Sequence, residues 1–260
     1  MPTPLPTKRC RVLFDGARAG ADNMALDEAL GETAAESRVP VLRFYTWIEP
    51  TLSLGYFQSL ADRDEHLPSR AAAVVRRASG GGAILHDREL TYSLALPCSE
   101  RDVGDAAWLY RAVHQALVDT LAEWQVLAAV RAEPGHAVPS GPVLTRPREP
   151  FLCFQRAAAG DVVLGGMKIA GSAQRRRRGA LLQHGSVLLA RSNFAPELPG
   201  ILELASVRIT PAELGKRWFA RLLRALDLTL DLACLTPAEE ARSAVLVAEK
   251  YGNPTWTAKR

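Results

Sequence analysis

Apolar residues at helical spacing predict several helices. In residues 105–124 the apolar side chains recur every four positions, as Leu109, Val113, Leu117 and Leu121. Residues 22–36 bring small and apolar side chains together after an Asp-Asn pair, which predicts an amphipathic helix with a polar cap at its start. Two more helices are predicted to begin after Thr210 and Thr236. In both cases proline follows the threonine and glutamate stands three residues after it, as in a capping box.

Apolar and alternating runs between these helices predict the strands of a sheet. The runs lie at residues 41–47, 52–57, 72–76, 92–96 and 181–189. Residues 161–164 and 167–170 flank Gly165-Gly166, and two strands around a two-residue glycine turn predict a β-hairpin that carries Lys168. Because helices come before, between and after the strands, we expect an α+β domain and not a regular βαβ alternation.

The length of the chain indicates one principal domain. A chain of 260 residues can bury one large core. We expect a catalytic domain over residues 1–235 and a C-terminal helical tail over residues 236–260. Residues 131–150 contain five prolines, so we expect an exposed loop there, just before Cys153.

The composition is that of a globular protein in water. Hydrophobic residues make up 48% of the chain and charged residues 23%. No apolar run approaches the roughly 18 residues of a membrane span, and the N-terminus has no apolar stretch that could serve as a secretory signal. We therefore expect a cytoplasmic protein without a membrane partner.

Positive charge raises the question of an acidic partner. The formal net charge is +4 and the pI is about 9.0, which suits an acidic protein or nucleic acid, but a genome rich in G+C would explain the many arginines equally well. Four consecutive arginines occupy residues 175–178. Such a run is most often a solvated loop, and docking of an acidic protein is the functional alternative. Nucleic acid is less favoured, because no aromatic residues are interleaved with these arginines.

The four cysteines lie far apart. They form no C-x-x-C pair and have no histidine nearby at zinc spacing, so we expect neither a disulfide framework nor a metal site. Three of them, Cys10, Cys98 and Cys234, neighbour no motif. Cys153 stands between Leu152 and Phe154, and on that observation alone it is more often a small core residue than a nucleophile.

A run of three glycines at residues 80–82 interrupts the predicted sheet. Two arginines and Ser79 precede it, and His86 follows. Glycines between strands are costly in conformational entropy, so either a structural bulge or the close approach of a ligand to the backbone has to explain them. Their N–H groups could bind a carbonyl or phosphate oxygen. The spacing fits neither the P-loop nor the dinucleotide-binding pattern.

Five segments together resemble the biotin/lipoate protein ligase and octanoyltransferase family, in the same order along the chain. They are NMALDEAL (23–30), LRFYTWIEPTLSLGYFQ (42–58), RRASGGGAILHD (76–87), MKIAGSAQ (167–174) and LQHGSVLL (182–189). The resemblance extends from about residue 13 to 190. It implies a mixed or antiparallel sheet domain flanked by helices, similar to the catalytic domain of class II aminoacyl-tRNA and biotin synthetases, with an acyl chain bound in a tunnel.

The resemblance also implies the residues of the site. The arginine-glycine loop would close over the carbonyl end of the acyl group, and two residues of LQHGS would complete the wall. The residues expected to bind substrate are Arg77, Ser79, Gly80, Gly81, Gly82, His86, His184 and Gly185. Lys168 would reach the acyl carbonyl.

The family includes ATP-dependent lipoate ligases and transferases that take octanoate from an acyl carrier protein. Two features favour the LipM-type transferases. Cys153 stands where a ligase of the family typically has an Asn-Asp pair, and HDRELTYS at residues 86–93 resembles the transferase form of that segment. A cysteine suits acyl transfer because its thiolate is a strong nucleophile and a good leaving group, and a nearby cation stabilises it.

The expected reaction moves an octanoyl or lipoyl group from acyl carrier protein to a lysine of a lipoyl domain or glycine cleavage H protein. Cys153 would be the nucleophile, Lys168 and the glycine-loop N–H groups would stabilise the oxyanion, and no cofactor would be needed. Two alternatives remain. An ATP-dependent lipoate or biotin ligase would require ATP and Mg²⁺, and a non-catalytic lipoyl-binding protein would have no need of the retained Cys153 and Lys168.

Overall fold

The computed structural model describes residues 8–98, 106–132 and 150–260. The main sheet has eight described strands in the order β11-β1-β2-β6-β10-β9-β8-β7. Their bounds are β1 Lys8–Arg18, β2 Val41–Trp47, β6 Glu89–Pro97, β7 Ala129–Val130, β8 Val162–Leu164, β9 Met167–Arg177, β10 Ala180–Leu188 and β11 Leu228–Leu232. β1 pairs in parallel with β2 and β11, whereas the other neighbours pair antiparallel, so the sheet is mixed.

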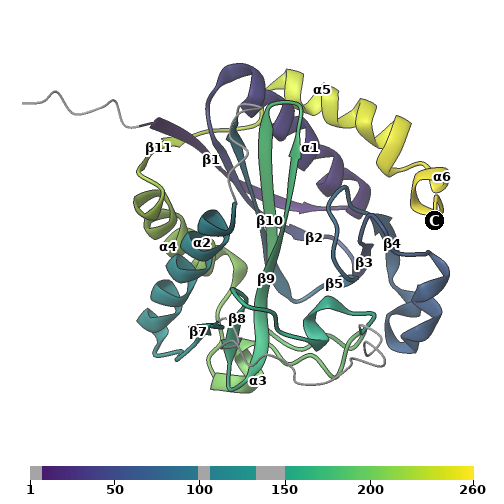
Figure 1. The fold of residues 1–260 in the computed structure, drawn as a ribbon, viewed down its shortest axis with the longest axis vertical. Helices are drawn as coiled ribbons and strands as arrows, with labels where there is room; N and C mark the ends of the chain where they lie inside the picture. Colours follow the sequence, from purple (N-terminus) through teal and green to yellow (C-terminus); the bar gives the residue numbers. More distant parts are fainter. Residues whose placement is uncertain (1–7, 99–105, 133–149) are drawn as a thin grey trace, which may run out of the picture.

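Helices cover both faces of this sheet (Figure 1). On one face lie α2 (Ala107–Leu121) and α4 (Pro211–Ala225), and on the other lie α1 (Gly20–Ser37) and α5 (Pro237–Leu246). The apolar stripe of α2 packs with α4 and with strand residues such as Phe44 in the largest core cluster, which includes Leu117 and Trp218. The predicted α+β class, a mixed sheet flanked by helices, is therefore confirmed.

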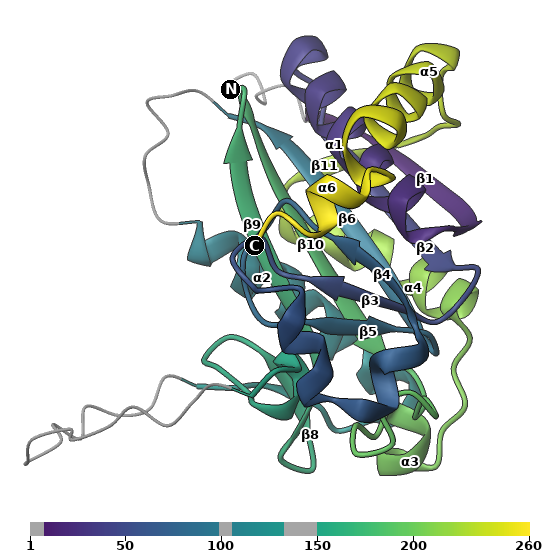
Figure 2. The ribbon, with the colours of Figure 1, turned by 90° about the vertical axis from the view of Figure 1, so that its right-hand side faces the viewer.

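A second sheet of three strands, in the order β4-β3-β5, stands beside the main sheet (Figure 2). Its strands are β3 Thr51–Leu54, β4 Ala73–Arg76 and β5 Ile84–His86, and two 3-10 turns, η1 Ala61–Glu65 and η2 Leu67–Ala71, join β3 to β4. Its own core cluster includes Leu52 and Leu85 and extends to Leu152 and Phe154. The small sheet thus brings the glycine run, which follows β4, next to the segment that contains Cys153.

The remaining elements are short. They are η3 Ala122–Trp124, η4 Cys153–Gln155, α3 Ile201–Ala205, the π-helical turn η5 Val247–Tyr251 and α6 Pro254–Thr257. The residues of the predicted C-terminal tail pack against the rest of the chain: Arg11 pairs with Glu239 at 2.5 Å, and the indole of Trp256 donates to the Arg76 carbonyl at 2.8 Å. No helix in the described part of the chain is long and apolar enough to cross a membrane.

Several sequence predictions are confirmed. The helix predicted over 105–124 appears as α2 followed by the turn η3, and both capping boxes form, at Thr210 with Glu213 and at Thr236 with Glu239. The hairpin around Gly165-Gly166 forms as β8 and β9, and both glycines have positive φ, at 56° and 82°. Most of the predicted proline-rich loop, residues 133–149, lies outside the described residues.

Three local predictions are wrong. Helix α1 begins at Gly20 after Ala19, which has no capping side chain, and Asn23 lies inside the helix and donates to two carbonyls instead. The strand predicted over 52–57 ends at Leu54, because the chain turns there against the carbonyl of Gly81. The four arginines are not a loop: three of them end strand β9.

Candidate active site

Cys153 and Lys168 meet at the start of β9 in the main sheet. Cys153 begins the single turn η4, and Lys168 is the second residue of β9, directly after the hairpin turn. The Lys168 ammonium donates to the Cys153 sulfur at 3.5 Å and lies 5.0 Å from the centre of the Phe154 ring. The hairpin therefore holds a buried cation against a half-buried thiol.

The carboxylate of Asp161 fixes the position of this cation. Its Oδ2 pairs with Lys168 Nζ at 2.9 Å, and both side chains are nearly inaccessible, with 2% and 5% of their surface exposed. The carboxylate also accepts from the Tyr110 hydroxyl at 2.6 Å and from the Ala158 N–H at 2.8 Å. Burial, and then the Asp161 charge, raise the pKa of Tyr110, so the phenol stays a donor. Because each partner is fixed by others, Lys168 cannot swing freely.

A chain of buried hydrogen bonds supports this group from behind. His114 Nδ1 donates to the Gly160 carbonyl at 2.6 Å, and its Nε2 is 2.7 Å from the Ser172 hydroxyl. The Ser172 N–H in turn donates to Tyr110 at 3.1 Å. Burial lowers the pKa of His114 to about 4, so the ring is neutral near pH 7 and its tautomer follows from the carbonyl that it faces.

Gly171 gives the lysine the space that it needs. A Cβ at this position would lie 2.5 Å from Lys168 Cε and 2.6 Å from Lys168 Nζ. The side chain of Lys168 therefore folds back over the bare backbone of its own strand to reach Asp161. Any side chain at residue 171 would displace the ammonium from the thiol.

The glycine loop lies against Cys153, and Arg77 holds it from the inside. A Cβ on Gly82 would be 3.3 Å from the Cys153 nitrogen. Arg77 is buried and donates to the carbonyls of Gly80 at 2.9 Å and Gly82 at 2.6 Å, and also to that of Ser53. Burial lowers its pKa to about 10, so it remains charged at neutral pH.

This grip orients the N–H groups of the loop. In a trans peptide the C=O and N–H point in opposite directions, so an arginine that binds the Gly80 carbonyl turns the Gly81 N–H away from itself. Gly81 has φ of +92°, a conformation that other residues adopt only with strain. Among the described residues, the N–H groups of Gly80, Gly81 and Gly82 donate to no acceptor. They are available to an oxygen of a ligand.

Ser79 and His184 face each other across the next part of the site. The serine hydroxyl is 2.5 Å from His184 Nε2, and His184 Nδ1 is 3.7 Å from Asp27 of α1. Burial alone would raise the pKa of Asp27, yet the neighbouring His184 and the charge of Arg43 lower it. The histidine thus joins the glycine loop to helix α1.

His86 is turned away from Cys153 and into the small sheet. Its Nε2 is 2.8 Å from the Ser53 hydroxyl, its Nδ1 is 2.7 Å from Glu89, and its ring stacks on Trp47 with centroids 4.0 Å apart. The Ser53 hydroxyl also accepts a hydrogen bond from Arg77. His86 therefore supports, through Ser53, the arginine that lies under the loop. The structure therefore places it behind the loop.

A narrow inner cleft runs between the two sheets. Residues of the small sheet, β9, β10 and α1 form its wall, among them Met24, Ile84, His86, Ala173, His184 and Gly185. Gly185 keeps the strands close, because a Cβ there would be 2.3 Å from the Ser172 hydroxyl oxygen. Arg77 and Ile84, on either side of the glycine run in the sequence, also line the inner cleft.

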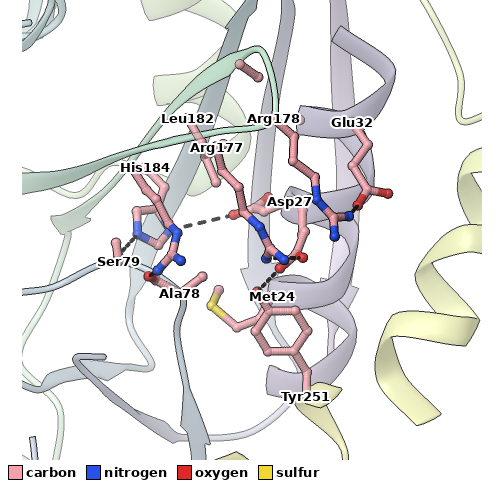
Figure 3. A pocket seen from close by; sticks show the side chains of 14 residues that line it. Met24, Asp27, Glu32, Ala78, Ser79, Arg177, Arg178, Leu182, His184 and Tyr251 are labelled. Atoms are coloured by element: carbon pink, nitrogen blue, oxygen red, sulfur yellow. Dashed lines mark hydrogen bonds and ion pairs between the residues drawn. The ribbon is translucent and has the colours of Figure 1, made fainter. Parts of the chain in front are cut away.

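An outer pocket lies next to the inner cleft, and Met24 and His184 line both. Figure 3 shows Met24 and Asp27 on α1 facing Leu182 and His184 on β10. Most of its wall is apolar. Ion pairs close its far end, among them Arg178 with Glu32 at 3.2 Å. The apolar wall suits a ligand that is apolar along its length.

Within residues 8–98, 106–132 and 150–260, no three His, Cys, Asp or Glu side chains gather as metal ligands would. The four cysteines are all free thiols. The groups available for chemistry are the thiol, the ammonium and the backbone N–H groups.

Comparison with known proteins identifies the family. The catalytic-domain family described as lipoyl protein ligase A/B matches residues 19–202. The chain belongs to this family. The motif resemblance is thereby confirmed, and the matched range contains the glycine loop, Cys153, Lys168 and His184.

Its curated relatives in the family are similar over nearly their full length. Octanoyltransferase LipM of Symbiobacterium thermophilum is 35% identical, with 96% of this chain and 98% of the relative covered. The protein of the same name from Staphylococcus aureus is 31% identical, again with 96% and 98% covered. The resemblance to the LipM type is therefore also confirmed.

Solved structures of lipoate protein ligases share the fold. A bi-partite lipoate protein ligase from Thermoplasma acidophilum has a TM-score of 0.74 at 20% identity, with 96% of each chain covered. A lipoate-protein ligase A bound with ATP has a TM-score of 0.72 at 22% identity, with 96% of this chain and 98% of that chain covered. The predicted synthetase-like sheet domain is thus the fold of this family.

Sequence reasoning missed several residues of the site. Asp161 could have been found, because regular alternation along the predicted hairpin puts it on the same side as Lys168. Tyr110 and His114 lie on α2, where four positions separate them and place them on one face. Asp27 and Gly171 gave no signal of their own: the first depends on how α1 lies on the sheet, and the second on the path of the lysine side chain.

Proposed function

We propose that this chain carries an octanoyl group as a thioester on Cys153, from an acyl carrier protein to a lysine of a lipoyl-accepting protein. Octanoyl transfer in protein lipoylation is the activity of this chain, in line with LipM relatives that match nearly its whole length. The observation that best supports a thioester on Cys153 is the contact of Lys168 Nζ with Cys153 Sγ at 3.5 Å, beside the glycine loop.

In the first half-reaction the Cys153 thiolate attacks the carbonyl carbon of the donor thioester. A new C–S bond forms, the carbonyl electrons move to oxygen, and collapse of the tetrahedral intermediate expels the donor thiol, which takes up a proton. Lys168 stabilises the thiolate before attack. As charge moves to the carbonyl oxygen, the ammonium and the Gly81 N–H become donors to it, which favours the transition state over the ground state.

In the second half-reaction the neutral amine of the acceptor lysine attacks the acyl-enzyme. A C–N bond forms, the C–S bond breaks, and Cys153 leaves as a thiolate that Lys168 again stabilises. The proton that the new amide nitrogen loses passes to solvent or to the departing thiolate. The same cation therefore serves both steps, because each of them either consumes or releases the thiolate.

The octanoyl chain extends from Cys153 into the inner cleft and toward the outer pocket. The supporting observation is the position of the two spaces. Arg77 and Ile84, on either side of the glycine run in the sequence, line the inner cleft. Met24 and His184 line both the cleft and the outer pocket. An apolar chain buried there gains roughly 0.8 kcal/mol per CH₂ group. The Ser79–His184 hydrogen bond lies along this path and holds the loop closed over it.

Mass measurements of enzyme and acceptor test this proposal. With octanoyl carrier protein and no ATP, the wild type should gain one octanoyl group, and a peptide map should place it on Cys153. Cys153→Ala should form no adduct and should acylate no acceptor. Cys98→Ala is the matched control, since its thiol is also half-buried and free, and it should keep full activity.

Two results would overturn the cysteine route. One is an octanoyl adduct on a different cysteine, with Cys153→Ala still active. The other is acylation of the acceptor that requires ATP and free acid, since that outcome selects the ligase chemistry of acyl adenylates.

A further inference from the structure

Three cations surround the ring of Tyr56, which lies beside the glycine loop. Lys259 Nζ lies 3.3 Å from the centre of the Tyr56 ring and 3.7 Å from that of Trp256. The guanidinium groups of Arg175 and Arg260 lie 5.1 Å and 5.7 Å from the Tyr56 ring. Residues from three distant parts of the sequence thus form one cluster, here called the Tyr56 cluster.

The cluster touches the glycine loop. The Tyr56 N–H donates to the Ser79 carbonyl at 2.8 Å, and the Phe57 ring is 3.9 Å from the place where a Cβ of Gly80 would stand. Phe57 itself is 72% exposed and packs edge-to-face on Tyr56. An exposed aromatic ring among cations is the composition found where proteins bind proteins.

Arg76 anchors the C-terminal segment at this place. It is fully buried and donates from Nε and Nη2 to the Thr257 carbonyl at 3.0 Å and 2.7 Å, while Trp256 donates back to its carbonyl at 2.8 Å. Arg76, the first arginine before the glycine run, therefore holds α6 beside the site. Figure 2 shows α6 and the C-terminus in front of β9 and β10.

The positive charge of the cluster is not compensated by acidic side chains. In the part of the chain that the structure describes, no ion pair involves Arg175, Lys259 or Arg260. The neighbouring arginines differ, because Arg177 pairs with Glu28 at 2.6 Å and Arg178 pairs with Glu32. Unpaired cations held on aromatic rings attract an anionic partner over a long range, whereas paired ones do not.

We propose that the Tyr56 cluster docks the acidic acyl carrier protein that donates the octanoyl group. This inference rests on the proposed function, and it assigns the docking role to the unpaired cations around Tyr56 instead of to the arginine run as a whole. A donor that carries its acyl group on a phosphodiester-linked arm offers acidic side chains and a phosphate to these cations.

The location favours the donor over the acceptor. The cluster meets the glycine loop at Gly80, whereas Cys153 meets it at Gly82, so a protein docked on the cluster stands to one side of the thiol. A donor can work from there, because a long flexible arm delivers its thioester. An acceptor lysine has only its own side chain to reach the acyl-enzyme, so the acceptor has to bind directly over Cys153.

Charge reversal tests the proposal. In the double variant Lys259→Glu with Arg260→Glu, the KM for octanoyl carrier protein should rise about tenfold at low salt, because two rim charges change sign, and the effect should shrink as salt is added. Acylation of Cys153 by a small uncharged octanoyl thioester should be unchanged. The matched control is Lys216→Glu with Arg224→Glu, which makes the same charge change on exposed residues of α4, on the opposite face of the main sheet.

Direct titration of the holo carrier protein into each variant separates this inference from the proposed function. Weaker binding to the Lys259/Arg260 variant alone supports the docking surface even if turnover follows a different chemistry. Equal binding to wild type and variant, or a raised KM for the acceptor with an unchanged KM for the carrier, overturns it. Should the reversed variant unfold, Lys259→Gln with Arg260→Gln gives the same comparison with a smaller expected change of about threefold.

Discussion

Removal of the Lys168 side chain should affect stability and catalysis by separate routes. In Lys168→Ala, Asp161 loses the cation with which it pairs in the described part of the chain, and its carboxylate is only 2% exposed in the wild type. Breaking a buried pair from one side typically costs about 3 to 5 kcal/mol. For a chain of this size each kcal/mol shifts Tm by about 2 °C, so Tm should fall by roughly 6 to 10 °C.

The catalytic loss has a different origin. Lys168 Nζ is 3.5 Å from the Cys153 sulfur, so its loss removes a donor both to the thiolate and to the oxyanion that follows. Deletion of one oxyanion donor costs about 3 to 4 kcal/mol, which corresponds to a hundredfold to thousandfold slower acylation. Lys168→Arg should not restore the rate fully, because the planar guanidinium does not fit the space that Gly171 leaves for a compact ammonium.

A double variant separates the two effects. Asp161→Asn with Lys168→Ala removes the unpaired carboxylate and leaves an amide that can still accept from Tyr110. We expect it to regain most of the lost Tm but none of the lost rate. The assays are thermal unfolding and single-turnover formation of the octanoyl-enzyme in the wild type, both alanine variants and Lys168→Arg. If the double variant folds and its Cys153 is acylated at the wild-type rate, Lys168 has no role in the reaction and the proposed active site is wrong.

Two further predictions concern the outer pocket and the buried histidine. Gly31 lines the outer pocket from within α1, and a Cβ at this position would meet nothing within 4 Å. Because glycine inside a helix costs about 1 kcal/mol relative to alanine, Gly31→Leu should fold, and its side chain should shift kcat/KM toward acyl thioesters shorter than octanoyl. An unchanged chain-length profile would exclude the acyl chain from that pocket. The pKa of His114 is about 4 in the folded chain and about 6.5 in the unfolded chain. Between these two pH values only the unfolded state gains a proton as the pH falls. The free energy of unfolding should therefore drop by about 3 kcal/mol between pH 7 and pH 4. In His114→Gln that part of the drop should vanish in urea unfolding at several pH values, and parallel curves for both proteins would contradict the assignment.

Local patterns predicted the elements whose formation depends on neighbouring residues. The glycine turn before Lys168, the capping boxes at Thr210 and Thr236 and the apolar stripe of α2 all act within a few residues, and each appeared where it was predicted. The cap of α1 was wrong because Asn23 is drawn to carbonyls of a strand end, a contact that no local rule contains. The arginine run was wrong for a similar reason, since pairing with β10 extends β9 through it.

By itself, the sequence determined the family, the hairpin that carries Lys168 and the presence of a cysteine where acyl transfer would need one. Those features are local or are written as motifs. Only the tertiary structure decided which groups meet: Asp161 with Lys168, Arg77 beneath the loop, and Arg76 with the C-terminal segment. The physical reason is that a side chain's charge, partners and space depend on residues far away in the chain. A carboxylate or an arginine looks the same in a sequence whether it faces water, a ligand or its own backbone.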